Sequence, residues 1–198
     1  MLTIIGVGPG NPRYLTADAV TKIGRAKHIF GFGRVAQSLY PLNKNIIPIN
    51  RVDEILKYID KGKDAVLLAS GDPNFYGIVE YIKSKDIEIK EVLPGLTSFQ
   101  YLMGKLKKSW HNASFLSLHG RDGDLSKVRE NRLNIILTDK EHNPNYISKE
   151  LYRLGVVGKI YVGFNLSYID EVILTKDIGD DIEDISSLAV VVIEHEMD

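Results

Sequence analysis

The chain opens with a run of apolar residues, Leu2–Val7, that is continuous instead of alternating. Continuous runs of this length are typical of strands buried on both faces, as in parallel sheets. Thr16, a favourable helix N-cap, follows this run, and Ala17, Val20 and Ile23 then recur at helical spacing. The start of the chain therefore predicts a strand followed by an amphipathic helix.

The same alternation continues through the first half of the chain. It predicts strands at His28–Phe32, Asn45–Ile49, Ala65–Ser70 and Ile87–Leu93, and helices at Arg34–Tyr40, Asp53–Ile59, Tyr76–Lys85 and Thr97–Lys107. Gly62 is expected to end the helix that begins at Asp53. Strands that alternate with helices imply a mainly parallel sheet with helices on both faces.

The segment KKSWHNAS has neither helical nor strand periodicity, and we place a domain boundary near Lys108–Ala113. After it, the pattern predicts strands at Ser114–His119, Leu133–Thr138, Ile160–Phe164 and Leu188–Glu194, a strand pair around Glu171–Leu174, a helix at Pro144–Leu154 that ends at Gly155, and an exposed connection at Thr175–Ser187. The expected fold class is α/β, with an N-terminal domain over residues 1–108 and a C-terminal domain over residues 112–198. The first sheet should be mainly parallel, the second mixed, with a cleft between the domains.

The composition is that of an ordinary globular protein, with 44% hydrophobic and 26% charged residues over 198 positions. The net charge of −1 argues against a general polyanion-binding surface, so no nucleic-acid partner is expected. The start MLTIIGVGPG lacks the basic segment of a signal peptide, and no apolar run approaches the roughly 18 residues of a membrane-spanning helix. Together with the lack of cysteine, these features predict a soluble cytoplasmic protein with no membrane partner.

The glycine-rich segment GVGPGNP (Gly6–Pro12) leaves the first strand as a nucleotide-binding loop would. Its spacing is G-x-G-x-G instead of G-x-G-x-x-G, and Pro9 removes an N–H that a phosphate cradle would use. Two readings stay open: a tight strand-to-helix turn, which the spacing alone favours, and a loop that lines a cleft.

Two further segments follow predicted strands directly. In GDPNFYG (Gly71–Gly77), Asp72 is either a helix cap or part of an exposed backbone surface, with Phe75 or Tyr76 packing against a ligand. In PGLTS, Thr97 and Ser98 are likewise caps or ligand contacts. Because ligands bind at the carboxyl ends of parallel strands, two such loops together favour the binding interpretation.

The sequence gives little support for a metal site or for a catalytic nucleophile. The five histidines form no i, i+4 pair, and no G-x-S-x-G motif is present, so no metal site is predicted and a Ser-His-Asp triad has no motif behind it. The segment SLHGR (Ser117–Arg121) is either a solvated turn or a place where an imidazole and a cation hold a carboxylate. Lys105, Lys107 and Lys108 are best explained as favourable charges at a helix C-terminus.

Taken together, these segments resemble the tetrapyrrole methylases, the S-adenosylmethionine-dependent enzymes of corrin and sirohaem synthesis. The three motifs that carry the resemblance are IIGVGPGNPRYLT (Ile4–Thr16), LLASGDPNFYG (Leu67–Gly77) and LPGLTSFQ (Leu93–Gln100). The segments FGFGR (Phe30–Arg34), WHNASFLSLHGR (Trp110–Arg121) and NLSYIDEVI (Asn165–Ile173) look more like the branch that methylates C5 of precorrin-7 or cobalt-precorrin-7 in cobalamin biosynthesis. The resemblance spans essentially the full length.

The resemblance implies S-adenosylmethionine as cofactor, held in the cleft largely by backbone atoms. The cofactor-binding residues that it implies are Gly71, Asp72, Phe75, Thr97, Ser98, Leu137, Thr138 and Ala189. For the carboxylate-fringed corrinoid substrate, the candidates are Val7, Gly8, Pro9, Gly10, Arg13, Arg34 and Arg121. His119 is the candidate catalytic base. Since this cofactor has no phosphate, the failed phosphate spacing of GVGPGNP is also explained.

The resemblance further implies a homodimer that acts at C5 alone, because the chain stops at Asp198 and leaves C15 methylation and decarboxylation to a separate enzyme. Alternatives stay open: a tetrapyrrole methylase that acts at a different ring carbon, the similarly built diphthine synthase, or a non-catalytic nucleotide-binding module.

Overall fold

The computed structural model describes residues 1–59, 64–120 and 123–197. Contacts divide the chain into two compact units, Met1–Ser98 and Phe99–Asp198, and each is described by itself. Each unit contains one five-stranded sheet. The predicted α/β class, with a parallel first sheet and a mixed second one, is confirmed.

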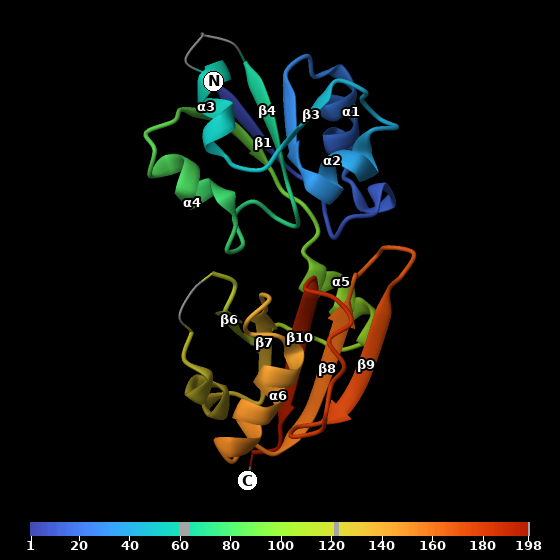
Figure 1. Ribbon diagram of the computed structural model, residues 1–198, viewed down its shortest axis with the longest axis vertical. Coiled ribbons are helices and arrows are strands. Elements are labelled where there is room, and N and C mark those ends of the chain that lie inside the picture. Colours follow the sequence, from blue (N-terminus) through green and yellow to red (C-terminus); the bar gives the residue numbers. More distant parts are fainter. Residues whose placement is uncertain (60–63, 121–122, 198) are drawn as a thin grey trace. The chain divides into compact units, whose positions relative to one another are not determined.

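The first unit is a parallel sheet of strand order β3-β2-β4-β1-β5 (Figure 1). Its elements in chain order are β1 (Leu2–Gly6), the 3-10 helix η1 (Pro12–Tyr14), α1 (Ala17–Arg25), β2 (Ile29–Phe32), α2 (Gly33–Leu39), β3 (Ile46–Ile49), α3 (Asp53–Ile59), β4 (Ala65–Ala69), α4 (Ile78–Lys83) and β5 (Ile89–Leu93). Thr16 caps α1 as predicted, because its Oγ1 accepts a hydrogen bond of 3.2 Å from the Ala19 amide.

Helices cover both faces of this sheet, as the continuous apolar strands require. One face packs Ile5 and Leu68 against Ile23 of α1 and Leu39 of α2. The other face carries a second buried cluster, in which Leu67 lies with Ile55 of α3, and Val79 and Ile82 of α4 belong to the same cluster. Figure 1 shows the two helix pairs on opposite sides of β1 and β4.

The second unit is a mixed sheet of order β6-β7-β10-β8-β9, in which only β6 and β7 pair in parallel. Its elements are α5 (Ser98–Leu106), β6 (Ser114–Ser117), the 3-10 helix η2 (Leu125–Glu130), β7 (Leu133–Leu137), α6 (Pro144–Arg153), β8 (Gly158–Phe164), β9 (Val172–Asp177) and β10 (Ala189–His195). Asn143 caps α6 through its side chain, and Pro144 stands in the first turn, where its missing N–H costs nothing.

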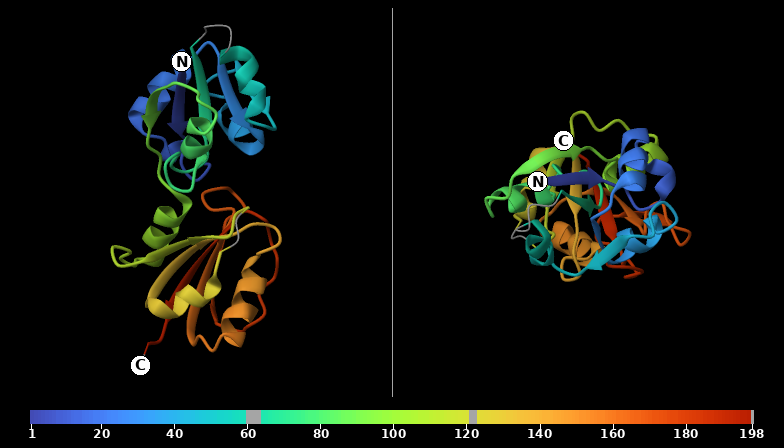
Figure 2. Two further views of the ribbon diagram at one scale, coloured as in Figure 1. Left: turned by 90° about the vertical axis from the view of Figure 1, so that its left-hand side faces the viewer. Right: turned by 90° about the horizontal axis from the view of Figure 1, so that it is seen from above.

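The last strand in sequence, β10, lies in the middle of this sheet, between β7 and β8. One face of the sheet packs Ile136 and Val191 against Ile147 and Leu151 of α6. On the other face lies α5, whose second residue, Phe99, has its ring centroid 5.0 Å from that of Phe115 on β6. Figure 2 shows α5 and α6 on opposite sides of the sheet.

The boundary between the two units differs from the one expected from the sequence. The division between the units falls between Ser98 and Phe99, after the first residue of α5, whereas the sequence placed the boundary near Lys108–Ala113. The reason is the packing of Phe99 on Phe115 and Trp110, which joins α5 to the second sheet. Gly62, the expected end of α3, lies outside the described residues.

The segment Thr175–Ser187 is not simply an exposed connection, so this prediction was wrong. β9 continues to Asp177, and Ile178 and Ile182 are buried in the core of the second unit. The Gly179 amide also donates to Ser148 Oγ at 2.9 Å, which ties the segment to α6. Acidic residues hid this anchoring in the sequence, because they surround the two isoleucines and give the segment the composition of a solvated loop.

Every helix in the described part of the chain is too short to cross a lipid bilayer, and α6, with ten residues, is the longest of them.

Candidate functional site

The three motif loops of the first unit meet at one edge of its sheet. They follow β4, β1 and β5, which are neighbours in the strand order, so their carboxyl ends lie side by side. A β-carbon placed on Gly6 would lie 2.5 Å from the Gly95 nitrogen and 2.8 Å from the Gly71 carbonyl oxygen. The backbones of the three loops therefore contact one another at a point where a side chain on Gly6 would overlap them. We call Gly6, Gly8, Gly71 and Gly95 the glycine corner.

A small antiparallel bridge holds the first two loops together. The Gly71 amide donates to the Gly8 carbonyl at 2.8 Å, and the Gly8 amide donates to the Gly71 carbonyl at 3.3 Å. Gly71 has φ +64°, a conformation that L side chains rarely adopt, yet a β-carbon there would meet only Thr97 Cα, at 3.9 Å. The positive φ, and not a lack of space for a β-carbon, is therefore what favours glycine at position 71.

The GDPNFYG segment forms a turn of its own before α4. Asp72 Oδ1 accepts a hydrogen bond of 2.8 Å from the Asn74 amide, and the Asp72 carbonyl accepts one of 3.2 Å from Phe75. The helix α4 begins at Ile78, and its N-cap residue, Gly77, provides no side-chain hydrogen bond. The interpretation of Asp72 as a helix cap was therefore wrong, because its side chain organises the loop and not the helix.

The predicted substrate residues of the first unit lie at the same edge. Val7 to Gly10 follow β1 and are buried, and Gly8 packs near Tyr14 and Leu96. Arg13 follows β1 within η1, and Arg34 follows β2, the strand next to β4; both side chains are exposed. Two cations thus border the glycine corner, on either side of β4.

In the second unit, His119 lies against the carboxyl end of β7. Its Nδ1 is 2.9 Å from the Thr138 carbonyl oxygen. A carbonyl oxygen only accepts, so Nδ1 carries the proton, and the neutral ring then has its lone pair on Nε2. His119 is exposed, and its ring therefore offers an oriented proton acceptor to solvent or to a ligand.

The other residues predicted in the second unit cluster with His119. The Thr138 hydroxyl donates to the Ala189 carbonyl at 2.8 Å, and the Leu118 amide donates to the Leu137 carbonyl at 2.9 Å. β6, β7 and β10 are neighbours, so His119, Leu137, Thr138 and Ala189 share one end of the sheet.

Asp139 is the residue that the sequence analysis missed. Its carboxylate accepts hydrogen bonds from the amides of Gly120, Glu141 and His142, at 3.1, 3.0 and 2.7 Å. The His142 amide is the main cause that lowers the pKa of Asp139 from 3.8 to about 2. Asp139 thus ties the loop of His119 to the loop after β7. The sequence did contain a signal for this role. An aspartate just after a predicted strand is typical of a turn in which the carboxylate accepts hydrogen bonds from the amides two and three residues later.

The structure thus gathers the predicted residues into two groups, one at the carboxyl edge of the first sheet and one at the end of the second sheet where β6 and β7 finish. Gly71, Asp72, Phe75, Thr97 and Ser98 lie by the glycine corner, and the second group surrounds Thr138. Arg121 lies outside the described residues. The binding roles of these residues, and the cleft expected between the domains, stay predictions.

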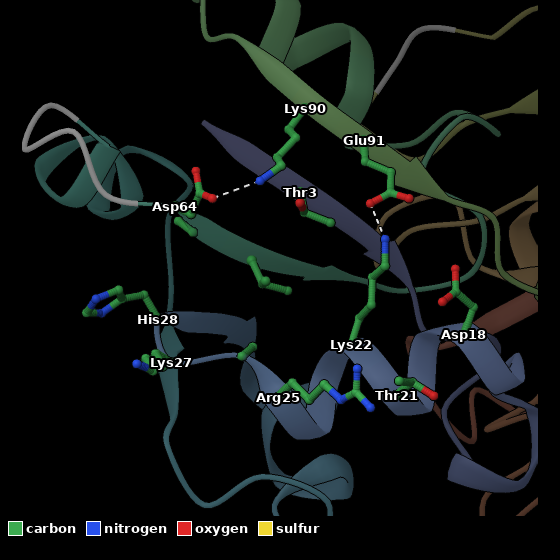
Figure 3. Close-up of a pocket in the computed structure, with 13 residues that line it drawn as sticks. Thr3, Asp18, Thr21, Lys22, Arg25, Lys27, His28, Asp64, Lys90 and Glu91 are labelled. Atoms are coloured by element: carbon green, nitrogen blue, oxygen red, sulfur yellow. Dashed lines mark hydrogen bonds and ion pairs between the residues drawn. The ribbon is translucent and has the colours of Figure 1, made fainter.

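A pocket of about 630 Å³ lies elsewhere in the first unit, at the amino ends of β1, β4 and β5 (Figure 3). Its walls carry two ion pairs, Lys90 with Asp64 at 2.8 Å and Lys22 with Glu91. Parallel strands place this pocket at the edge of the sheet opposite to the glycine corner. It is therefore separate from the predicted cofactor site.

Glycine-bearing loops at the carboxyl ends of three adjacent parallel strands are typical of α/β proteins that bind a ligand at that edge of the sheet. The motifs narrow this class further. The chain belongs to the tetrapyrrole (corrin/porphyrin) methylases, whose family model matches residues 1–180. The predicted family and the predicted methyltransferase class are confirmed, and S-adenosylmethionine is the methyl donor of this family.

Two curated relatives match along most of the chain. A protein of Methanocaldococcus jannaschii named "Probable cobalt-precorrin-7 C(5)-methyltransferase" is 30% identical over 201 residues, which cover 90% of each chain. The "Cobalt-precorrin-7 C(5)-methyltransferase" of Salmonella typhimurium is 29% identical over 182 residues, which cover 86% of this chain and 88% of the relative.

Solved structures share the fold. A cobalamin biosynthesis precorrin-6Y methylase from Archaeoglobus fulgidus superposes with a TM-score of 0.77 at 24% identity, covering 100% of this chain and 99% of that one. A uroporphyrin-III C-methyl transferase from Thermus thermophilus, solved with S-adenosyl homocysteine, gives a TM-score of 0.76 at 20% identity, covering 97% and 91%.

Proposed function

We propose that this protein transfers a methyl group from S-adenosylmethionine to C5 of cobalt-precorrin-7 or precorrin-7 in cobalamin biosynthesis. The observation that carries the proposal is the similarity, along 86–90% of the chain, to two relatives named for this reaction. Relatives named for C17 methylation of cobalt-factor III match only 50–65% of this chain, which favours C5 over that position.

The glycine corner supports the choice of cofactor. The loop after β1 lacks the N–H of Pro9, and its spacing does not form a phosphate cradle. A sulfonium cofactor without phosphates suits neutral backbone groups, and at the glycine corner the loops present main chain without side chains. Gly71, Asp72, Phe75, Thr97 and Ser98 would hold the cofactor, with Leu137, Thr138 and Ala189 of the second unit.

When bound, S-adenosylmethionine supplies a methyl group on a positively charged sulfur, and the sulfur keeps the electron pair of the broken bond. The protein then has to hold the ring carbon in line with that methyl group and to exclude water. No covalent nucleophile is required, which agrees with a sequence without cysteine.

His119 is proposed to remove a proton from the methylated substrate. The Thr138 carbonyl holds the proton of the neutral ring on Nδ1, so Nε2 is the atom that accepts. Asp139 acts on this step only indirectly, as a positioning residue that braces the loop of His119.

Arg13, Arg34 and Arg121 are proposed to bind carboxylates of the substrate through charge-assisted hydrogen bonds. The loop Val7–Gly10 would face the flat ring, where it presents backbone and no bulky side chain. We further propose that the protein is a cytoplasmic homodimer, and that a separate enzyme methylates C15 and decarboxylates the product.

The proposal is tested by incubating the purified protein with cobalt-precorrin-7 and S-adenosylmethionine, followed by mass spectrometry of the corrinoid and quantification of S-adenosyl homocysteine. One added methyl group at C5, located by NMR, is the expected result. Methylation at another carbon would show that the protein is a tetrapyrrole methylase that acts at a ring position other than C5. Binding of the cofactor without turnover would favour a non-catalytic module.

A further inference from the structure

The loop between β8 and β9, Asn165–Glu171, belongs to the motif NLSYIDEVI, to which the proposed function gives no role. In Figure 1 it connects the orange strands β8 and β9 at the end where β8 finishes. The pairing of Phe164 with Ala189 and of Val190 with Leu137 places this loop at the same end of the second sheet as Thr138. We call it the Ile169 loop.

The side chain of Ile169 is unusual for its exposure. Its relative exposure is 106%, whereas the next most exposed large apolar side chains of the described residues are Tyr152 at 67% and Val157 at 61%. A single exposed apolar residue needs no explanation by itself. The loop that carries it, however, is not an ordinary solvated turn.

Hydrogen bonds hold this loop in one conformation. Asn165, only 4% exposed, donates from Nδ2 to Asp170 at 2.8 Å and accepts from Ser186 at 2.7 Å. The Ser167 amide donates to Glu171 Oε2 at 2.6 Å, and Lys105 lies 3.4 Å from the same carboxylate. The acidic groups of the loop are thus engaged within the unit.

The backbone of the loop also departs from favourable geometry. Asn165 has φ +45° and Ser167 has φ +72°, and neither is a glycine. Backbone conformations of this kind are uncommon for residues other than glycine and cluster at functional sites. Between them, Leu166 folds back onto the sheet beside Gly163, where a β-carbon would overlap its side chain. Buried residues such as Leu166 thus fix the path of the loop, while the Ile169 side chain is exposed to solvent.

The loop is joined to the site by a short series of hydrogen bonds. The Asn165 amide donates to the Leu188 carbonyl at 3.0 Å, and the next residue, Ala189, accepts from the Thr138 hydroxyl at 2.8 Å. Two strand spacings separate β7 from β8, which is about 10 Å. A flat macrocycle beside His119, the proposed base that contacts the Thr138 carbonyl, would reach across this distance.

We propose that the Ile169 loop is a preformed contact for an apolar face of the tetrapyrrole substrate, with Ile169 as the side chain that contacts the ring. The inference rests on the proposed function, because it takes the corrinoid as the ligand at this end of the sheet. A rigid aliphatic side chain suits the flat, apolar face of such a ring.

The test compares Ile169→Ala and Ile169→Asp with the wild-type protein and with Val157→Asp. Val157 precedes β8 and is exposed at the opposite end of the same sheet, so it is a matched control. The Kd of cobalt-precorrin-7 is measured by absorbance titration in the presence of S-adenosyl homocysteine, together with KM and kcat. Burial of an isoleucine side chain predicts a Kd and KM about tenfold higher for Ile169→Ala, and higher again for Ile169→Asp.

S-adenosyl homocysteine affinity and the thermal unfolding temperature should stay at wild-type values in all three variants. Unchanged Kd and KM in both Ile169 variants would overturn the inference while wild-type turnover preserves the proposed function. Conversely, if the wild type binds the corrinoid without turnover, the proposed function is wrong. The Kd values of the Ile169 variants then still decide whether Ile169 contacts the corrinoid. A wild type that does not bind the corrinoid overturns both. If Ile169→Asp instead dissociates an oligomer in light scattering and leaves Kd unchanged, Ile169 contacts a second copy and the inference is wrong.

Discussion

Nδ1 of His119 lies 2.9 Å from the carbonyl oxygen of Thr138, and this one contact fixes which nitrogen of the ring is free to react. The Thr138 side chain is itself held by the Ala189 carbonyl, so the acceptor is part of the sheet and does not swing away. The proposed base is therefore oriented by main-chain groups from two strands.

His119→Asn and His119→Ala separate orientation from proton transfer. The asparagine amide can still donate to Thr138, as Nδ1 does, but has no counterpart of Nε2. We expect kcat to fall about 100-fold or more in both variants, since general-base catalysis contributes about that much. Affinity for S-adenosyl homocysteine, measured by calorimetry, should not change. Near-normal kcat in His119→Asn would show that Nε2 takes no proton.

Asp139→Asn should make stability depend less on pH. The folded protein holds the pKa of Asp139 at about 2 instead of 3.8, mainly through the His142 amide. A lowered pKa means that the carboxylate stabilises the fold above about pH 4, and that this contribution is lost as the pH falls toward 2. The variant should therefore melt at a lower temperature than wild type at pH 7, and the difference should shrink between pH 4 and 2.

Asp184→Asn is the control for this experiment, because Asp184 lies exposed in the connection before β10. Melting curves from circular dichroism at several pH values would measure both variants. An Asp139→Asn difference that stays constant down to pH 2 would contradict the assigned role of the charge.

Gly95→Ala should destabilise the first unit. A β-carbon on Gly95 would overlap the Gly71 carbonyl oxygen and lie 2.7 Å from the Gly6 carbonyl carbon. Relief requires the loops after β1, β4 and β5 to separate, which costs about 1–3 kcal/mol, as for other overpacked sites. Denaturant unfolding would measure this loss, and cofactor affinity should fall with it.

The matched control is Gly24→Ala in α1, where an added β-carbon meets nothing within 4 Å. Alanine is the better helix former by about 0.5–1 kcal/mol, so this variant should be as stable as wild type or more so. Equal losses in the two variants would mean that the close approach at the corner is not what requires glycine.

Arg13→Ala and Arg34→Ala should raise KM for the corrinoid without a loss of fold. Each removes an exposed cation at the carboxyl edge of the first sheet, and a charge-assisted hydrogen bond contributes about tenfold to affinity. Arg25→Ala, which removes a cation at the opposite edge, is the control. Steady-state kinetics in which Arg25→Ala has the largest effect would show that the carboxylates bind elsewhere.

Much of the fold follows from local patterns in the sequence. The helix predicted at Asp53–Ile59 has those same bounds in the structure, and Thr16 caps α1 as expected, because both depend on neighbouring residues alone. The motifs also placed Gly71 and Thr97 at the same edge, since all strands of a parallel sheet end on the same side.

What the sequence missed depends on contacts between distant residues. Phe99 joins α5 to the second unit through Phe115, and no local pattern reports that pairing. The burial of Ile178 and Ile182 and the bracing role of Asp139 are likewise decided by segments far away in the chain. The close approach of Gly6 to Gly95 was hidden for the same reason.

The central place of β10 sets the order in which the protein is able to form. β10 ends at His195, yet its two neighbours, β7 and β8, have left the ribosome well before it. Until the final strand emerges, both of them have an open edge that can pair with another nascent chain. The last strand of the first sheet ends at residue 93. That sheet can therefore form during synthesis before β10, the central strand of the second sheet, has been made.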